Sequence, residues 1–90
     1  MPYTKLTPDT RDILIDGFSE KIGEKILAQV DAAEAQNLRR YCLVGKNFCF
    51  YIRDGQISGS ISRGVGAKEI NGFISGIEAI DGPVQRFPVN

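Results

Sequence analysis

The chain has 90 residues, an apolar fraction of 42% and equal numbers of basic and acidic side chains, so its formal net charge is zero. Such a length accommodates one domain with one hydrophobic core, and this apolar fraction is typical of a folded chain rather than a disordered one. Two cysteines and no histidine exclude a disulfide framework and a zinc site of four Cys and His ligands.

The N-terminus lacks the features of a signal peptide. Residues 1–5 carry no basic segment that leads into an apolar stretch. No part of the chain approaches the roughly 18 apolar residues that a membrane span needs. We therefore expect a cytoplasmic protein that has no contact with membranes and needs no metal or other cofactor.

The neutral total hides an uneven distribution of charge. Residues 37–68 hold six Lys and Arg against Asp54 alone, whereas residues 1–36 hold seven Asp and Glu against four Lys and Arg. Residues 69–90 are acidic again. A basic middle between acidic ends is the strongest indication of a binding function in the sequence.

Residues 8–36 are predicted to be helical. Thr7 is a typical N-cap residue, and Pro8 is favoured at the first helical position. Apolar residues follow mostly four apart, a spacing that drifts around a straight helix. Gly17 and Ser19 offer a break, because Ser19 can cap a second helix. The pattern therefore predicts helices over residues 8–17 and 20–36.

Residues 39–62 are predicted to form a three-stranded antiparallel meander. Asp54-Gly55 is a strong two-residue hairpin turn, because a type I′ turn needs positive φ at both positions. Gly45-Lys46 is the matching candidate for the first hairpin. With these turns, Cys42 lies opposite Cys49 and Ile52 lies opposite Ile57.

This register separates apolar from polar side chains, as a sheet with one buried face requires. The predicted core face carries Tyr41, Leu43, Phe48, Phe50, Ile52, Ile57, Gly59 and Ile61. The outer face carries Arg40, Cys42, Val44, Asn47, Cys49, Tyr51, Arg53, Gln56, Ser58, Ser60 and Ser62.

Residues 67–80 show the apolar spacing of an amphipathic helix. We expect this helix to pack on the core face, with Phe73 against Phe50, and residues 81–90 to form an extended tail. The predicted fold is a single α+β domain over residues 1–90. It has an N-terminal helix or helix pair, a three-stranded antiparallel β-meander and a C-terminal amphipathic helix packed on one sheet face.

Three motifs resemble chemical sites but do not support one. Gly64-x-Gly66-x-Lys68 opens a helix but lacks the remaining residues of either nucleotide-binding pattern. Cys42 and Cys49 are interpreted as small core side chains rather than a redox pair. The carboxylates of the first third have no positioned partner for acid–base chemistry. We therefore expect a protein that is not an enzyme, with a small enzyme or nucleotide-binding protein as a distant third reading.

The outer sheet face is the predicted binding site, because Arg and Tyr dominate the energetics of many interfaces. Its candidate partner-binding residues are Arg40, Tyr51, Arg53, Lys46, Ser58 and Ser60. The expected function is an adaptor or inhibitor that docks on a protein with an acidic surface. The alternative is nucleic-acid binding by the same face, since a basic sheet with an aromatic side chain also stacks single strands.

The third strand is predicted to end the sheet. Residues 57–62 contain neither proline nor charge, so this edge is poorly guarded against pairing with another strand. We therefore expect a homodimer that forms through this edge.

Overall fold

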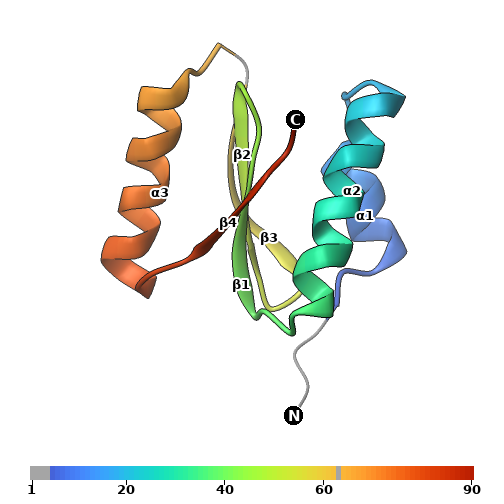
Figure 1. Cartoon of the computed structure of the whole chain (residues 1–90), viewed down its shortest axis with the longest axis horizontal. Coiled ribbons are helices and arrows are strands. Elements are labelled where there is room, and N and C mark those ends of the chain that lie inside the picture. The colour runs from blue at the N-terminus through green and yellow to red at the C-terminus, as the bar shows by residue number, and fades with distance from the viewer. Residues whose placement is uncertain (1–4, 63) are drawn as a thin grey trace.

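A computed structural model describes residues 5–62 and 64–90 of the chain. Arg63, which contributes to the basic balance of the middle segment, and residues 1–4 lie outside this part. The elements, shown in Figure 1, are α1 (Pro8–Ile15), α2 (Glu20–Ala35), β1 (Arg40–Val44), β2 (Phe48–Arg53), β3 (Gln56–Ser62), α3 (Ala67–Asp81) and β4 (Gln85–Pro88). The α+β class, the helix pair, the meander and the C-terminal helix are confirmed.

The helix pair forms because both helices have side-chain caps. The Thr7 hydroxyl accepts a hydrogen bond from the Thr10 amide at 3.1 Å, and the Ser19 hydroxyl accepts one from the Ile22 amide at 3.3 Å. Gly17 has a φ of +86°, which lets the chain turn between the helices. The break between the two helices therefore lies at Gly17 and Ser19, as predicted.

The sheet has four strands, in the order β3-β2-β1-β4. The predicted tail contains β4, which pairs in parallel with β1 and places Phe87 beside Leu43. Past the strand, the Val89 amide donates to the Val44 carbonyl at 2.7 Å. Phe87 and Val89 are buried, so the end of the chain completes the core rather than trailing from it.

The predicted register of the first hairpin is wrong. Cys42 lies opposite Tyr51 instead of Cys49. The Gly45 amide donates to the Phe48 carbonyl at 2.9 Å, so the turn is centred one residue later than predicted. A Cβ at Gly45 would overlap the Phe48 ring, which packs directly over this glycine. Each residue of β1 pairs with a β2 residue two positions further along than predicted. A register shift of two residues leaves every side chain of both strands on its predicted face.

In the second hairpin, Ile52 lies opposite Ile57 as predicted, but the register shifts beyond this pair. Tyr51 pairs with Gly59 and Cys49 with Ile61, so Ser58 is the extra residue of a β-bulge. The bulge turns Gly59 and Ile61 to the opposite face of the sheet from that predicted.

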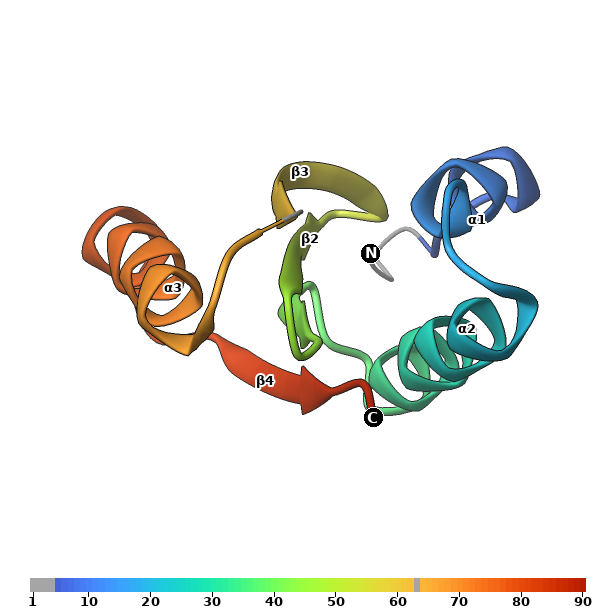
Figure 2. The same ribbon diagram turned by 90° about the horizontal axis from the view of Figure 1, so that it is seen from above.

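The placement of the closing helix on the core face is also wrong. Figure 2 shows α1 and α2 on one side of the sheet and α3 on the other. The chain has to pass from β3 at one edge to β4 at the other, and the first two helices already occupy one face. Consequently α3 crosses the face that was predicted to be open.

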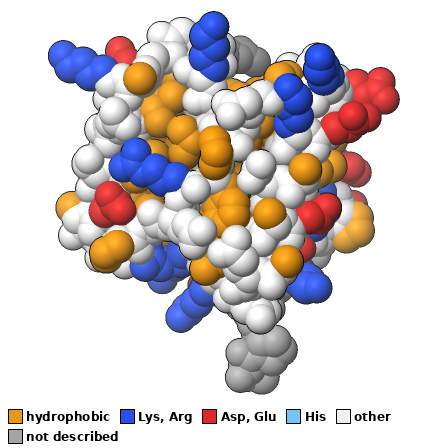
Figure 3. Space-filling view, viewed as in Figure 1, with side chains coloured by type: hydrophobic (Ala, Val, Ile, Leu, Met, Phe, Trp, Pro, Cys, Tyr) orange, Lys and Arg blue, Asp and Glu red, His pale blue; other side chains and the backbone are white. Residues whose placement is uncertain are grey.

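Each face of the sheet carries its own apolar cluster. Beneath α1 and α2 lie Tyr41, Leu43, Phe48, Phe50, Ile52 and Phe87, among others. Beneath α3 lie Cys42, Cys49, Tyr51, Ile70 and Ile74. Phe50 and Phe73 therefore belong to opposite clusters and do not link the sheet to one helix. Hydrophobic side chains remain visible in the seam between α3 and the strands (Figure 3).

The packing of α3 predicts a large difference between two isoleucines of the same helix. Ile74 is fully buried against the sheet, whereas Ile80 is 85% exposed. We expect Ile74→Ala to lower the free energy of unfolding by about 2–5 kcal/mol and Ile80→Ala to change it by less than about 0.5 kcal/mol. Urea denaturation measures both. Equal losses in the two variants would contradict the placement of α3.

Candidate functional site

The central residue of the predicted binding face is not accessible. Tyr51 lies on β2 and is only 5% exposed, because α3 packs over it. Its hydroxyl donates a hydrogen bond of 2.8 Å to the Asp81 carboxylate at the C-terminal end of α3. The prediction that Arg40, Tyr51 and Arg53 form an open sheet face is therefore wrong.

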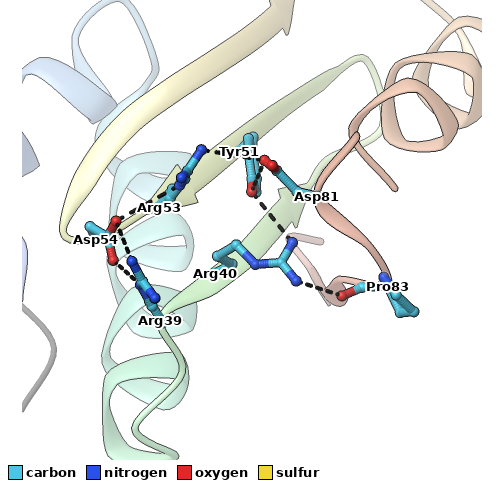
Figure 4. A network of polar contacts seen from close by, with 7 residues as sticks. All are labelled: Arg39, Arg40, Tyr51, Arg53, Asp54, Asp81 and Pro83. Carbon is cyan, nitrogen blue, oxygen red and sulfur yellow. Dashed lines mark hydrogen bonds and ion pairs between the residues drawn. The ribbon is translucent and has the colours of Figure 1, made fainter. Parts of the chain in front are cut away.

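The two arginines of that face are engaged within the chain (Figure 4). Arg40 donates to the Pro83 carbonyl at 3.2 Å and to the Tyr51 hydroxyl at 3.5 Å. Arg53 lies 3.6 Å from an Asp81 oxygen. Both arginines therefore hold the end of α3 and the following loop against the sheet.

Two of the six basic residues in the middle segment form ion pairs with acidic side chains. Arg39 forms an ion pair and a hydrogen bond with Asp54, whose carboxylate also lies 3.8 Å from Arg53. The hydrogen bond from Arg39 lowers the pKa of Asp54 and raises the pKa of Arg39. Three of the six basic residues of this segment, Arg39, Arg40 and Arg53, thus make polar contacts inside the domain.

The remaining predicted site residues do not join this cluster. Lys46 is exposed at the turn between β1 and β2, at the far end of β1 from Arg40. Ser58 is the bulged residue of β3. Ser60 lies opposite Phe50 and so points towards the α1–α2 side of the sheet. The structure brings together Arg40, Tyr51 and Arg53 but not Lys46 and the serines.

Cys42 and Cys49 lie buried beneath α3 as free thiols. They sit on adjacent strands in diagonal positions rather than directly opposite each other. A hydrogen bond between the thiols lowers the pKa of Cys42 and raises the pKa of Cys49. In the described residues, no group of three or more His, Cys, Asp or Glu side chains could hold a metal ion.

The carboxylates left without an ion pair or side-chain hydrogen bond in the described part of the chain are concentrated near the N-terminus. They are Asp9, Asp12, Asp16, Glu20 and Glu24. Three of them lie on or directly after α1, three and four residues apart, and hence on one side of that helix.

Ile13 lies among these aspartates and is 68% exposed, although it is a large apolar residue. It lines the mouth of a cavity of about 250 Å³ between α1 and the sheet. The rings of Phe18, Phe48 and Phe50 line the cavity, and Asp16 and Ser62 also border it. A larger cavity of about 470 Å³ adjoins it across Phe18 and Phe48 and reaches Lys46 and Val89.

The cavity opens beside an edge of the sheet. Ser62 is the last residue of β3, and Figure 2 shows α1 next to this strand while α2 lies next to β4. We call Asp9, Asp12, Ile13, Asp16 and Ser62, with the adjoining cavity, the α1–β3 surface. It combines an exposed apolar side chain, a hollow lined by both aromatic and polar residues, and a set of carboxylates without ion-pair partners among the described residues.

The sequence analysis did not identify this surface, because aspartates on a helix are usually solvated and an isoleucine in a helical apolar pattern is usually buried. A weak signal was present, since Ile13, Leu14 and Ile15 are consecutive and span roughly 200° around a helix, so they cannot all face one core.

The fold and the site define a small α+β domain with a four-stranded sheet between helices and an acidic, partly apolar surface at one edge. No protein-family model matches this chain, and neither a curated protein nor a solved structure is significantly similar to it. Among the helices of residues 5–62 and 64–90, none is long and apolar enough to cross a membrane.

The contact between Tyr51 and Asp81 predicts a measurable role in stability. We expect Tyr51→Phe to lower the free energy of unfolding by about 1–2 kcal/mol, because Asp81 loses a hydrogen bond. Asp81→Asn is the control: it keeps an acceptor for Tyr51 but removes the partly exposed ion pair with Arg53, for a loss below about 1 kcal/mol.

The same tyrosine predicts a pH dependence. Burial, with a further contribution from the bond to Asp81, raises the pKa of Tyr51 in the folded state. The stabilisation is therefore complete below the pKa of an unfolded tyrosine, about 10, and is lost as the pH rises through the folded-state value. Thermal unfolding of Tyr51→Phe should lack this alkaline component. An unchanged pH profile would show that Tyr51 is not held as described.

Proposed function

We propose that this domain is a non-enzymatic protein-binding module, an adaptor or inhibitor, that docks its partner on the α1–β3 surface. The observation that carries the proposal is the exposure of Ile13 at the mouth of a cavity lined by three phenylalanine rings. Burying such a side chain in an interface contributes about 1.5–3 kcal/mol, and apolar anchors in pockets are typical centres of interfaces.

The charges near Ile13 favour a partner with a basic surface. Asp9, Asp12 and Asp16 have no ion-pair partner among the described residues, so a neighbouring protein can supply it. This differs from the acidic partner expected from the sequence, which depended on an open face around Arg40 and Tyr51. Surface carboxylates also contribute to the rate of encounter with a basic partner.

The nucleic-acid alternative depended on the same face that α3 covers. Phosphate groups would be repelled by the aspartates of α1, and the arginines that could attract them are engaged with Asp54, Asp81 and the Pro83 carbonyl. We therefore prefer a protein partner.

Affinity capture from the cells that produce the protein tests the proposal. The two large exposed isoleucines provide a matched pair, with Ile13→Asp as the test and Ile80→Asp as the control. We expect Ile13→Asp to lower the recovery of the specific partner at least about tenfold, since a charge replaces the anchor. Recovery with Ile80→Asp should remain within about twofold of wild type.

Quantitative mass spectrometry of the captured proteins gives both ratios, and circular dichroism verifies that each variant folds. Equal recovery of every captured protein by wild type and Ile13→Asp would contradict the proposal. Loss of the partner with Ile80→Asp alone would place the docking site on α3 instead.

A further inference from the structure

The outward side of β3 offers backbone groups to another strand. The Gly45 amide donates to the Phe48 carbonyl, so Phe48 and Phe50 direct their backbone groups towards β1, while Cys49 and Tyr51 direct theirs towards β3. Gly59 and Ile61 are the partners of Tyr51 and Cys49 in β3. The N–H and C=O of Ser60, which lies between these two residues, consequently point away from the sheet.

The two edge strands of the sheet, β3 and β4, differ in how readily they can pair with an additional strand. β4 has four residues and carries Arg86 and Pro88, both of which discourage further pairing. β3 has seven residues, Gln56–Ser62, without charge or proline. The bulge at Ser58 discourages pairing with a further strand only in the half of β3 next to the turn. Gly59–Ser62 pairs regularly with β2 and ends beside the cavity.

The cavity suits a side chain of an added strand. Side chains of a strand next to β3 would alternate between the α1 side and the α3 side of the sheet. On the α1 side the space at the end of β3 is bordered by Ser62, Ile13 and Phe50 and has a volume of about 250 Å³. Strand addition of this kind derives affinity from main-chain hydrogen bonds and specificity from pockets for alternate side chains.

The negative charge of α1 indicates which kind of strand would pair with this edge. A second copy of the chain would bring a β3 with no Lys or Arg between Gln56 and Ser62, together with another acidic α1. A foreign segment with lysine or arginine on the α1 side would instead neutralise Asp12 and Asp16. The observations thus favour a basic segment over the homodimer expected from the sequence.

We propose that an extended, basic segment of the partner protein adds to β3 as a fifth strand alongside Gly59–Ser62. It places a bulky apolar side chain in the cavity and its lysine or arginine side chains towards α1. This inference rests on the proposed function and adds to it the mode of docking and the chemistry of the recognised segment.

Short synthetic peptides test the inference without knowledge of the partner. The probe is a blocked peptide in which threonine alternates with lysine and one phenylalanine, so that the lysines and the phenylalanine share one side of a strand. The control peptide has glutamate in place of lysine. Titration of the ¹⁵N-labelled protein should give a dissociation constant below about 1 mM for the lysine peptide and at least tenfold weaker binding for the glutamate peptide.

Two variants at one position separate backbone pairing from side-chain contacts. Ser60→Pro removes the outward N–H without removing a hydrogen bond to β2, whereas Ser60→Ala removes the hydroxyl and keeps the N–H. Strand addition predicts that Ser60→Pro weakens the lysine peptide at least about tenfold and that Ser60→Ala stays within about twofold. The amide signals of Ser60 and Ser62 should shift on binding to wild type.

The outcomes distinguish this inference from the proposed function. Strand addition would be overturned if the lysine peptide did not bind, if both peptides bound equally, or if Ser60→Pro and wild type had equal affinity for the lysine peptide. In each of these cases the capture experiment with Ile13→Asp still decides whether the partner docks on the α1–β3 surface. Conversely, strand addition stands on the peptide results even if capture does not depend on Ile13. A concentration-dependent dimer in sedimentation equilibrium that Ser60→Pro abolishes would assign the edge to a second copy and overturn the basic partner.

Discussion

Burial of the central strands on both faces is the constraint on which the rest of this structure depends. In β2, Phe48, Phe50 and Ile52 pack beneath α1 and α2, while Cys49 and Tyr51 pack beneath α3. A strand with apolar side chains on both faces is stable only where both faces are covered. The connection from β3 to β4 meets this requirement, because it passes from one edge of the sheet to the other over the uncovered face.

This arrangement explains the charges of the middle segment. The arginines at the ends of β1 and β2 lie next to the point where α3 ends, so they contact Asp81 and the Pro83 carbonyl within the domain. The carboxylates of Asp9 and Asp12 on α1 have no ion-pair partner within residues 5–62 and 64–90, and both residues are exposed. A count of charges along the sequence indicated a basic binding face, whereas the charges without partners in the described residues are mainly those of the acidic first helix and the scattered lysines.

Local signals in the sequence predicted the elements well, because caps and tight turns depend on a few adjacent residues. Thr7 and Ser19 begin helices as expected, and Asp54-Gly55 closes its hairpin with both residues at positive φ. Non-local features could not be predicted in this way. The packing of Phe48 over Gly45 moved the first turn by one residue, and the bulge at Ser58 reversed the faces of Gly59 and Ile61.

The face covered by α3 was misassigned, although the unbroken apolar run from Phe48 to Ile52 is typical of a strand buried on both sides. The prediction of one polar sheet face relied on the alternation of apolar and polar side chains in β1 and β3, where arginines and serines form the polar set. The free edge of β3 was predicted from the order of the strands, whereas the exposure of Ile13 depends on how α1 packs against the sheet.

The most direct test of this account is the reactivity of the two thiols, because Cys42 and Cys49 both lie on the face that α3 covers and neither is exposed. A disulfide reagent with a chromophoric leaving group should leave both thiols of the native protein unmodified over a period in which it fully modifies the unfolded chain. Rapid modification of both thiols under native conditions, with the domain folded, would show that α3 does not cover the sheet and would contradict the account.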